Sequence, residues 1–206
     1  ADDIDLAALD RVPEGTWAAL RTKRIYFGHQ SVGGNVIDGV REILRRKPAI
    51  GLRVADAREG DAFASPGLIH GPVGANENVP LKLKEFADAV AAHGASLDMA
   101  MMKFCYADLR ADAPTGALAL LASYARTVGE IEKANPKLRM VHCTIPLTAL
   151  QVGPKARIKA LLGRDNGGDN IPRQEYNVGL LKAFGESAVF DIALSESRGL
   201  GDSPAS

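Results

Sequence analysis

Several classes of protein are excluded by what the chain lacks. Its 206 residues contain two cysteines, which are too few for a disulfide scaffold and lack the paired spacing of a zinc site. The 25 basic residues are balanced by 25 acidic ones, and no basic stretch mixed with aromatics compensates, so we expect no nucleic-acid partner. The longest apolar runs, at 97–104 and 117–125, are shorter than the about 18 residues of a membrane helix, so we expect no membrane span.

The usual sequence signals of a bound cofactor are also missing. The glycines at positions 28, 33 and 34 fit neither Gly-x-Gly-x-x-Gly nor the phosphate-binding pattern that ends in lysine. The four histidines show no His-x-His or His-x-x-x-His spacing. We therefore expect no nucleotide cofactor and no metal.

The length and composition predict one domain over residues 1–206. A chain of this size that is 46% hydrophobic can bury a substantial core without disulfides. The sequence begins Ala-Asp-Asp, which is consistent with a mature secreted chain, so we expect a periplasmic or secreted location.

Strand-like and helix-like periods alternate along the chain. Apolar runs predict five strands, at 24–28, 51–55, 97–105, 138–145 and 188–193. Periodic apolar positions and end signals predict four helices, at 35–46, 78–94, 113–134 and 172–184, with Asn78 and Asp112 as N-caps. This alternation predicts an α/β fold with three layers, a doubly wound five-stranded parallel sheet. Ligands of such sheets bind outside the carboxyl ends of the strands.

The first strand ends in a polar turn, Gly28-His29-Gln30-Ser31, that leads directly into a helix. Ser31 would then lie at a helix N-terminus, where free N–H groups and the helix dipole stabilise a developing anion. A nucleophilic serine needs such a place. The alternatives are that Ser31 is simply the N-cap of the helix or that the turn binds a phosphate. His29 is a candidate base, substrate contact or structural donor.

Two further strand ends carry candidate site residues. The loop before the second helix contains Gly74 and Asn76, which could supply oxyanion donors or simply form a turn. Lys103 lies within an apolar strand, so we expect it to meet a carboxylate, with Asp108 nearest in sequence, or to reach the cleft. A nucleophilic role for Cys143 is disfavoured, because a cysteine in a buried strand is usually inert. The candidate substrate-binding residues are Gln30, Lys103, Tyr106 and Asp108.

In this arrangement the chain resembles the SGNH (GDSL-like) hydrolases, a superfamily of flavodoxin-like esterases and acyl hydrolases. The resemblance is to a branch in which the first block reads Gly-His-Gln-Ser, here residues 28–31. It implies that Ser31 is the nucleophile, that Gly74 is the glycine of the second block, and that Asn76 acts beside it. The segment 170–177 and the Val-Phe-Asp at 189–191 are similar to the part that precedes the last block.

The chain departs from that family at two blocks. The third strand supplies no Gly-x-Asn-Asp, so an oxyanion donor would come from Asn76, from Tyr106 or from neither. The last block, Asp-x-x-His, is absent after Asp191. Three explanations stay open: the chain lacks its C-terminal helix, which we favour, or another histidine (His29, His70 or His142) replaces the base, or the protein is not a working hydrolase.

These residues leave two main functional hypotheses. The first is a serine esterase acting on a small-molecule or carbohydrate ester. The second is a carbohydrate-binding or cell-envelope-binding module that keeps the fold without catalysis. We expect the loops at 56–78 and 147–171 to shape specificity in either case.

Overall fold

The computed structural model describes residues 6–148 and 168–197. Its strands are β1 (Arg24–His29), β2 (Val54–Asp56), β3 (Gly67–Pro72), β4 (Met99–Met102), β5 (Arg139–Cys143) and β6 (Val189–Phe190). Its α-helices are α1 (Ala7–Asp10), α2 (Glu14–Arg21), α3 (Val32–Arg46), α4 (Val79–His93), α5 (Ala117–Ala134), α7 (Asn170–Phe184) and α8 (Ile192–Ser197). Most of the expected specificity loop at 147–171 lies outside the described residues.

All six strands pair in parallel, in the order β2-β3-β1-β4-β5-β6. The predicted doubly wound α/β sheet is therefore confirmed, but the predicted count of five strands is wrong. The additional strand is β3, which we expected to be part of a loop. Its sequence Gly-Leu-Ile-His-Gly-Pro contains turn residues at both ends. The strand forms because it lies between β1 and β2, whose backbones satisfy its hydrogen-bonding groups.

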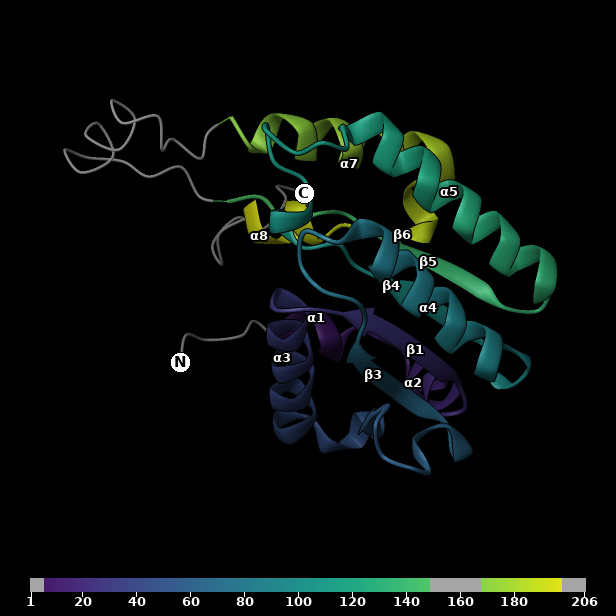
Figure 1. Ribbon diagram of the computed structural model, residues 1–206. Helices are drawn as coiled ribbons and strands as arrows, with labels where there is room; N and C mark the ends of the chain where they lie inside the picture. The colour runs from purple at the N-terminus through teal and green to yellow at the C-terminus, as the bar shows by residue number, and fades with distance from the viewer. Residues whose placement is uncertain (1–5, 149–167, 198–206) are drawn as a thin grey trace.

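Helices cover both faces of the sheet (Figure 1). On one face, helices α2 and α3 contribute Leu20 and Ile37 to a cluster that includes Ile25 and Phe27 of β1. On the other face, α4, α5 and α7 contribute to a larger cluster around Tyr26 of β1. Alternate residues of β1 thus reach opposite layers, as a central parallel strand requires.

Several element boundaries differ from the prediction, including the start of helix α5 and the end of the last strand. Helix α5 begins at Ala117 with Gly116 as its N-cap, four residues later than a cap at Asp112 would place it. The last strand ends at Phe190, because the carboxylate of Asp191 accepts a hydrogen bond from the N–H of Leu194 (2.9 Å) and a helix follows. We expected no helix after the last strand, so this part of the prediction is wrong.

The strand order locates the ligand-binding edge. Without β2, the order is that of flavodoxin-like sheets, in which the chain reverses its direction of winding between the first strand and its neighbour. Here that switch point lies between β1 and β4. Ser31 follows the end of β1, and Lys103 follows the end of β4.

Candidate functional site

Ser31 has a strained backbone between β1 and α3. Its φ of 41° and ψ of −107° are rare for a residue with a side chain. Its side chain is exposed and makes no capping hydrogen bond, so the residue does not serve as a conventional N-cap. A sharp strand-to-helix turn with an exposed serine at its apex is the geometry of a nucleophile elbow.

Gly33 permits this turn. A Cβ atom built on Gly33 would lie 2.3 Å from the Cβ of His29, far inside van der Waals contact. His29 and Gly33 are thus in close contact where helix α3 begins against the end of β1. A side chain at position 33 would force the first turn of α3 away from β1.

The N-terminus of α3 offers a backbone donor beside Ser31. The N–H of Gly33 donates to the carbonyl of Gln30 (2.9 Å), and the N–H of Gly34 donates to that of Ser31 (2.7 Å). Within residues 6–148 and 168–197, the N–H of Val32 has no such acceptor. It stands at the positive end of a helix of 15 residues, where an oxyanion would be stabilised.

His29 is engaged with a second histidine. Its Nε2 lies 3.1 Å from Nδ1 of His70, whose Nε2 lies 3.2 Å from the guanidinium of Arg41. Because a guanidinium can only donate, we assign the proton of His70 to Nδ1 and that of His29 to its own Nδ1. That Nδ1 is buried without a hydrogen-bond partner among the described residues.

Both histidines are held neutral. Burial, then the charges of His70 and Lys103, lowers the pKa of His29 to about 4. Burial and then Arg41 lower the pKa of His70. Within the described residues, no hydrogen bond joins His29 or His70 to Ser31. Their geometry is that of a structural pair beneath the elbow.

The other two histidines are also committed elsewhere. Nδ1 of His142 lies 2.9 Å from the hydroxyl of Tyr124, and its ring stacks on Phe184. His93 stacks on Phe63 at the end of α4. In the described part of the chain, therefore, no histidine is hydrogen-bonded to Ser31.

The Gly74 loop is tied down by hydrogen bonds. Its N–H donates to the carboxylate of Glu85 (2.6 Å), and its carbonyl accepts from the side chain of Gln30 (2.6 Å). Gly74 has φ of 56°, and a Cβ there would lie 2.6 Å from the backbone N of Lys82. The positive φ and the close approach of Lys82 explain why this position is a glycine. Its N–H is already hydrogen-bonded to Glu85, contrary to the expectation that it is an oxyanion donor.

Asn76 lies in the same loop with its amide oriented. Its Oδ1 accepts a hydrogen bond from the Nζ of Lys82 (3.0 Å), and the residue is exposed. Because the side-chain oxygen of Asn76 is bonded to Lys82, its NH2 group is the part that can donate a hydrogen bond toward solvent.

Asp108 is paired with Lys82, not with Lys103. The two side chains are fully buried and 2.5 Å apart. Asp108 also accepts from the N–H of Cys105 (2.6 Å) and of Glu77 (2.8 Å). Our expectation that Lys103 meets Asp108 is therefore corrected: Asp108 pairs with Lys82 and holds the loops after β3 and β4 together.

Lys103 is left without a carboxylate. It is 1% exposed, and its Nζ donates to the carbonyl of Phe104 (3.1 Å). Among the described residues it forms no ion pair within 4.0 Å. Desolvation lowers the pKa of its ammonium.

Tyr106 is exposed at the edge of the site. The guanidinium of Arg173 lies 5.7 Å from the centre of its ring, and Nε of Arg173 donates to the carbonyls of Tyr106 (3.0 Å) and Leu109 (2.9 Å). Arg173, itself buried, thus fixes the loop after β4 against α7. The phenol ring is accessible to a ligand.

Cys143 is buried and unreactive in this setting. Burial raises the pKa of its thiol to about 12, so the thiolate is not formed near neutral pH. This agrees with the expectation that the thiol is inert.

Sequence reasoning missed Lys82 and Arg173. Both residues occupy positions that face the core of their helix. Lys82 lies between Val79 and Phe86 on the apolar face of α4, and Arg173 lies one turn before the buried Tyr176 in α7. A charged residue at a core position of a helix indicates a buried ion pair or hydrogen-bond network.

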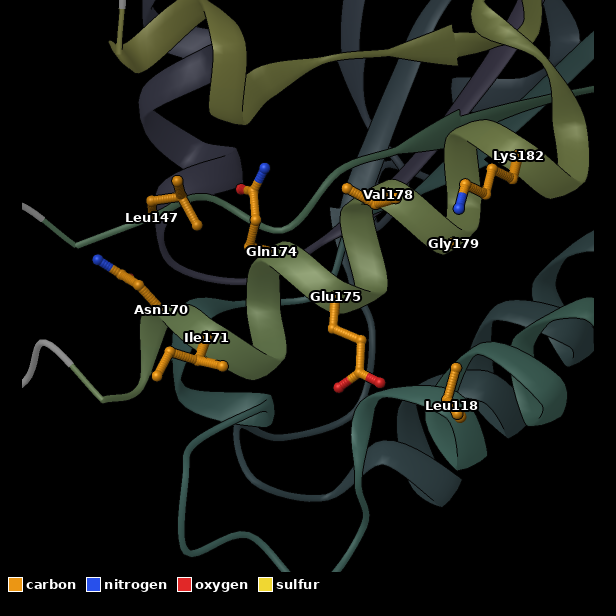
Figure 2. Close-up of a pocket in the computed structure, with 9 residues that line it drawn as sticks. All are labelled: Leu118, Leu147, Asn170, Ile171, Gln174, Glu175, Val178, Gly179 and Lys182. Carbon is orange, nitrogen blue, oxygen red and sulfur yellow. The ribbon is translucent and has the colours of Figure 1, made fainter.

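A separate groove lies on α5 and α7 (Figure 2). Its volume is about 740 Å³, and apolar side chains such as Leu118 and Ile171 line it. Figure 2 shows Glu175 of α7 directed toward the side of the groove on which Leu118 lies. Ser31 and Lys103 do not line it.

The described residues contain neither a metal-binding cluster nor a membrane-spanning helix. In residues 6–148 and 168–197, no group of three or more histidine, cysteine, aspartate or glutamate side chains is placed to hold a metal. Across the same ranges, every helix is too short or too polar to cross a membrane.

Comparison with known proteins does not assign the chain to a family. No protein-family model and no curated protein matches it. A solved structure provisionally named a platelet activating factor from Streptococcus pneumonia aligns with 87% of this chain and 72% of its own, with a TM-score of 0.41 and 14% identity. A similarity of this size carries no argument about activity, so the interpretation below depends on the geometry.

Proposed function

We propose that this protein is a serine hydrolase that cleaves an ester through Ser31. The observation that carries the proposal is the strained, exposed Ser31 at the switch point of the sheet, with a side chain that caps nothing. Backbone strain of this kind costs about 1–3 kcal/mol. It persists only where the surrounding structure enforces it, and it is concentrated at functional sites.

The proposed reaction passes through an acyl-enzyme. Ser31 Oγ attacks the ester carbonyl, the alcohol leaves, and water releases the acid. The N–H of Val32 and the helix dipole would stabilise the oxyanion, with the amide of Asn76 as a second donor. A small acyl group on a carbohydrate is the substrate class that the family resemblance suggests.

Hydrolysis of p-nitrophenyl acetate tests the proposal. Ser31→Ala is expected to reduce turnover at least 100-fold while the thermal unfolding curve stays close to that of the wild type. Ser96→Ala, at the far end of α4, is the matched control, since its hydroxyl donates to the carbonyl of His93 and lies outside the site. Equal turnover in wild type and Ser31→Ala contradicts the proposal.

The second candidate is a binding module without catalysis. It is favoured by the occupied N–H of Gly74 and by the absence, among described residues, of a histidine bonded to Ser31. Calorimetric titration with an acetylated oligosaccharide separates the two candidates. Binding that is unaffected by Ser31→Ala, with no release of acetate by the wild type, favours the module.

A further inference from the structure

Lys103 is a buried cation whose burial the fold does not explain. Among the described residues, ion pairing does not explain it, because Asp108 is already bonded to Lys82 and to two backbone N–H groups. Within the same residues, the Nζ of Lys103 has one hydrogen-bond partner, the carbonyl of Phe104. Burying an ammonium with so little compensation is costly, and such lysines frequently lose their proton.

Lys103 lies beside the Ser31 elbow. Its backbone N–H donates to the carbonyl of Gly28 (3.1 Å), one step beyond the paired residues Gly28 and Met102. Lys103 therefore stands next to His29, close enough that its protonated form lowers the pKa of that residue. The first turn of α3 rests on His29 through Gly33. Ser31 and Lys103 therefore follow the ends of two neighbouring paired strands, at the same edge of the sheet.

The surroundings of Lys103 supply little negative charge. The groups that interact with it electrostatically come from β1, α4, the loop after β4, β5 and α8; they are His29, Lys82, Cys105, Asp108, Cys143 and Glu196. His29 and Cys143 are neutral near pH 7, and Lys82 with Asp108 forms a closed pair. Among the described residues, Glu196 of α8 is the remaining carboxylate that interacts with it.

We propose that Lys103, as a neutral amine, is the general base that takes the proton of Ser31. This inference rests on the proposed function and names a base for it, chosen because Lys103 is a buried amine beside the elbow with a single backbone carbonyl as hydrogen-bond partner among the described residues. A serine paired with a lysine is a known variant of the serine–histidine arrangement.

Each step balances. The lone pair of Nζ takes the Oγ proton as Oγ bonds to the ester carbon and the carbonyl electrons move to oxygen. The carbonyl re-forms, the bond to the alcohol oxygen breaks, and the ammonium returns its proton to that oxygen. In the second half, Nζ takes a proton from water, the hydroxide adds to the acyl carbon, and Ser31 leaves with the proton.

The test is the pH dependence of Ser31 labelling by a fluorophosphonate, read by peptide mapping. In the wild type we expect the labelling rate to rise with pH and level off as Lys103 loses its proton. Lys103→Met has nearly the same shape and no amine. We expect it to be labelled about 100-fold more slowly or worse, and without the plateau, since a general base contributes about 10²–10⁴-fold.

A second variant keeps Lys103 and tests the same role, in case Lys103→Met does not fold. The carboxylate of Glu196 stabilises the ammonium, so Glu196→Gln should move the inflection of the profile to lower pH. Glu186→Gln, in the short helical turn before β6, is the matched control and should leave the profile unchanged. A lysine with a purely structural role would not give this shift.

The outcomes separate the two proposals. Labelling of Ser31 in Lys103→Met at the wild-type rate, or a profile that Glu196→Gln does not shift, overturns the role of Lys103 and leaves Ser31 as nucleophile. No labelling of Ser31 in the wild type overturns both. Slower labelling in Lys103→Met together with the shift in Glu196→Gln supports the base.

Discussion

Gly33 and Gly34 are neighbouring glycines with different surroundings. A Cβ at Gly33 would collide with His29, whereas a Cβ at Gly34 would meet nothing within 4 Å. We expect Gly33→Ala to lower the free energy of unfolding by about 1–3 kcal/mol and to abolish labelling of Ser31, because the first turn of α3 must move.

Gly34→Ala is the matched control for this pair. It should be neutral or slightly stabilising, since alanine is the better helix former. Urea unfolding measures both variants. Equal stability of the two would show that the close contact between Gly33 and His29 does not hold the elbow.

Lys103→Met also has a predicted effect on stability. Replacing a buried amine that has one carbonyl partner by an apolar side chain of similar shape should raise the melting temperature, because burying a polar group with so little hydrogen bonding is costly. Differential scanning calorimetry at pH 7 measures the change. A large fall in melting temperature would mean that the Lys103 side chain makes a stabilising contact, and would contradict its role as a base.

At the scale of single residues, the sequence predicts that Ser31 lies before a helix and that Lys103 is buried, but not which residues they contact. The placement of Ser31 before a helix follows from the local pattern of the chain. The pairing of Asp108 with Lys82 in preference to Lys103 does not, because it depends on how α4 packs beside the loop after β4. Contacts between elements distant in sequence are not visible in local patterns.

Helix α4 carries two lysines that should respond very differently to the same substitution. Lys82 is fully buried against Asp108, whereas Lys84 forms an exposed pair with Asp88 four residues later. Lys82→Met should cost about 3–5 kcal/mol of stability, because it leaves the carboxylate of Asp108 buried and unpaired.

Lys84→Met is the control on the same helix. Its exposed pair is worth about 0.3–0.5 kcal/mol, so the variant should unfold close to the wild type. Chemical denaturation compares the two variants. A small effect of Lys82→Met would indicate that Asp108 takes up a proton or finds water when its partner is removed.

Among the elements, the long periodic helices are predicted well and β3 is not. The apolar spacing of α3 and α4 is strong, and Asn78 caps α4 as expected by accepting from the N–H of Leu81 (3.1 Å). Strand β3 instead owes its existence to pairing on both sides, which overrides its glycines and proline.

For the whole molecule, the buried histidines predict a loss of stability in mild acid. Burial lowers the pKa of both His29 and His142 to about 4, against an ordinary value near 6.5. Below pH 6.5 these histidines bind protons in the unfolded chain but stay neutral in the folded protein until the pH approaches 4. The free energy of unfolding therefore falls as pH drops from about 6.5 to about 4.

Urea unfolding across this pH range measures the slope. His142→Gln can still bond to Tyr124 and lacks a titrating ring, so it should show a shallower slope than the wild type. A wild-type stability that stays constant between pH 6.5 and 4.5 would contradict the account of these histidines.

The overall architecture follows from the sequence because alternating periods leave few arrangements. Right-handed crossovers between parallel strands place helices on both faces and bring the strand ends to one edge. That argument predicts that Ser31 and Lys103 lie at the same edge of the sheet. It does not predict the hydrogen bonds that occupy Gly74, which arise from the approach of α4 to the loop.

The most direct test of the central claim, that Ser31 is an activated nucleophile, is intact-mass analysis after treatment with a fluorophosphonate. Peptide mapping locates any adduct, and Ser31→Ala and urea-unfolded protein serve as controls. We predict one adduct, on Ser31, in the folded wild type and none in either control. Folded wild-type protein that stays unmodified at Ser31 would contradict the account.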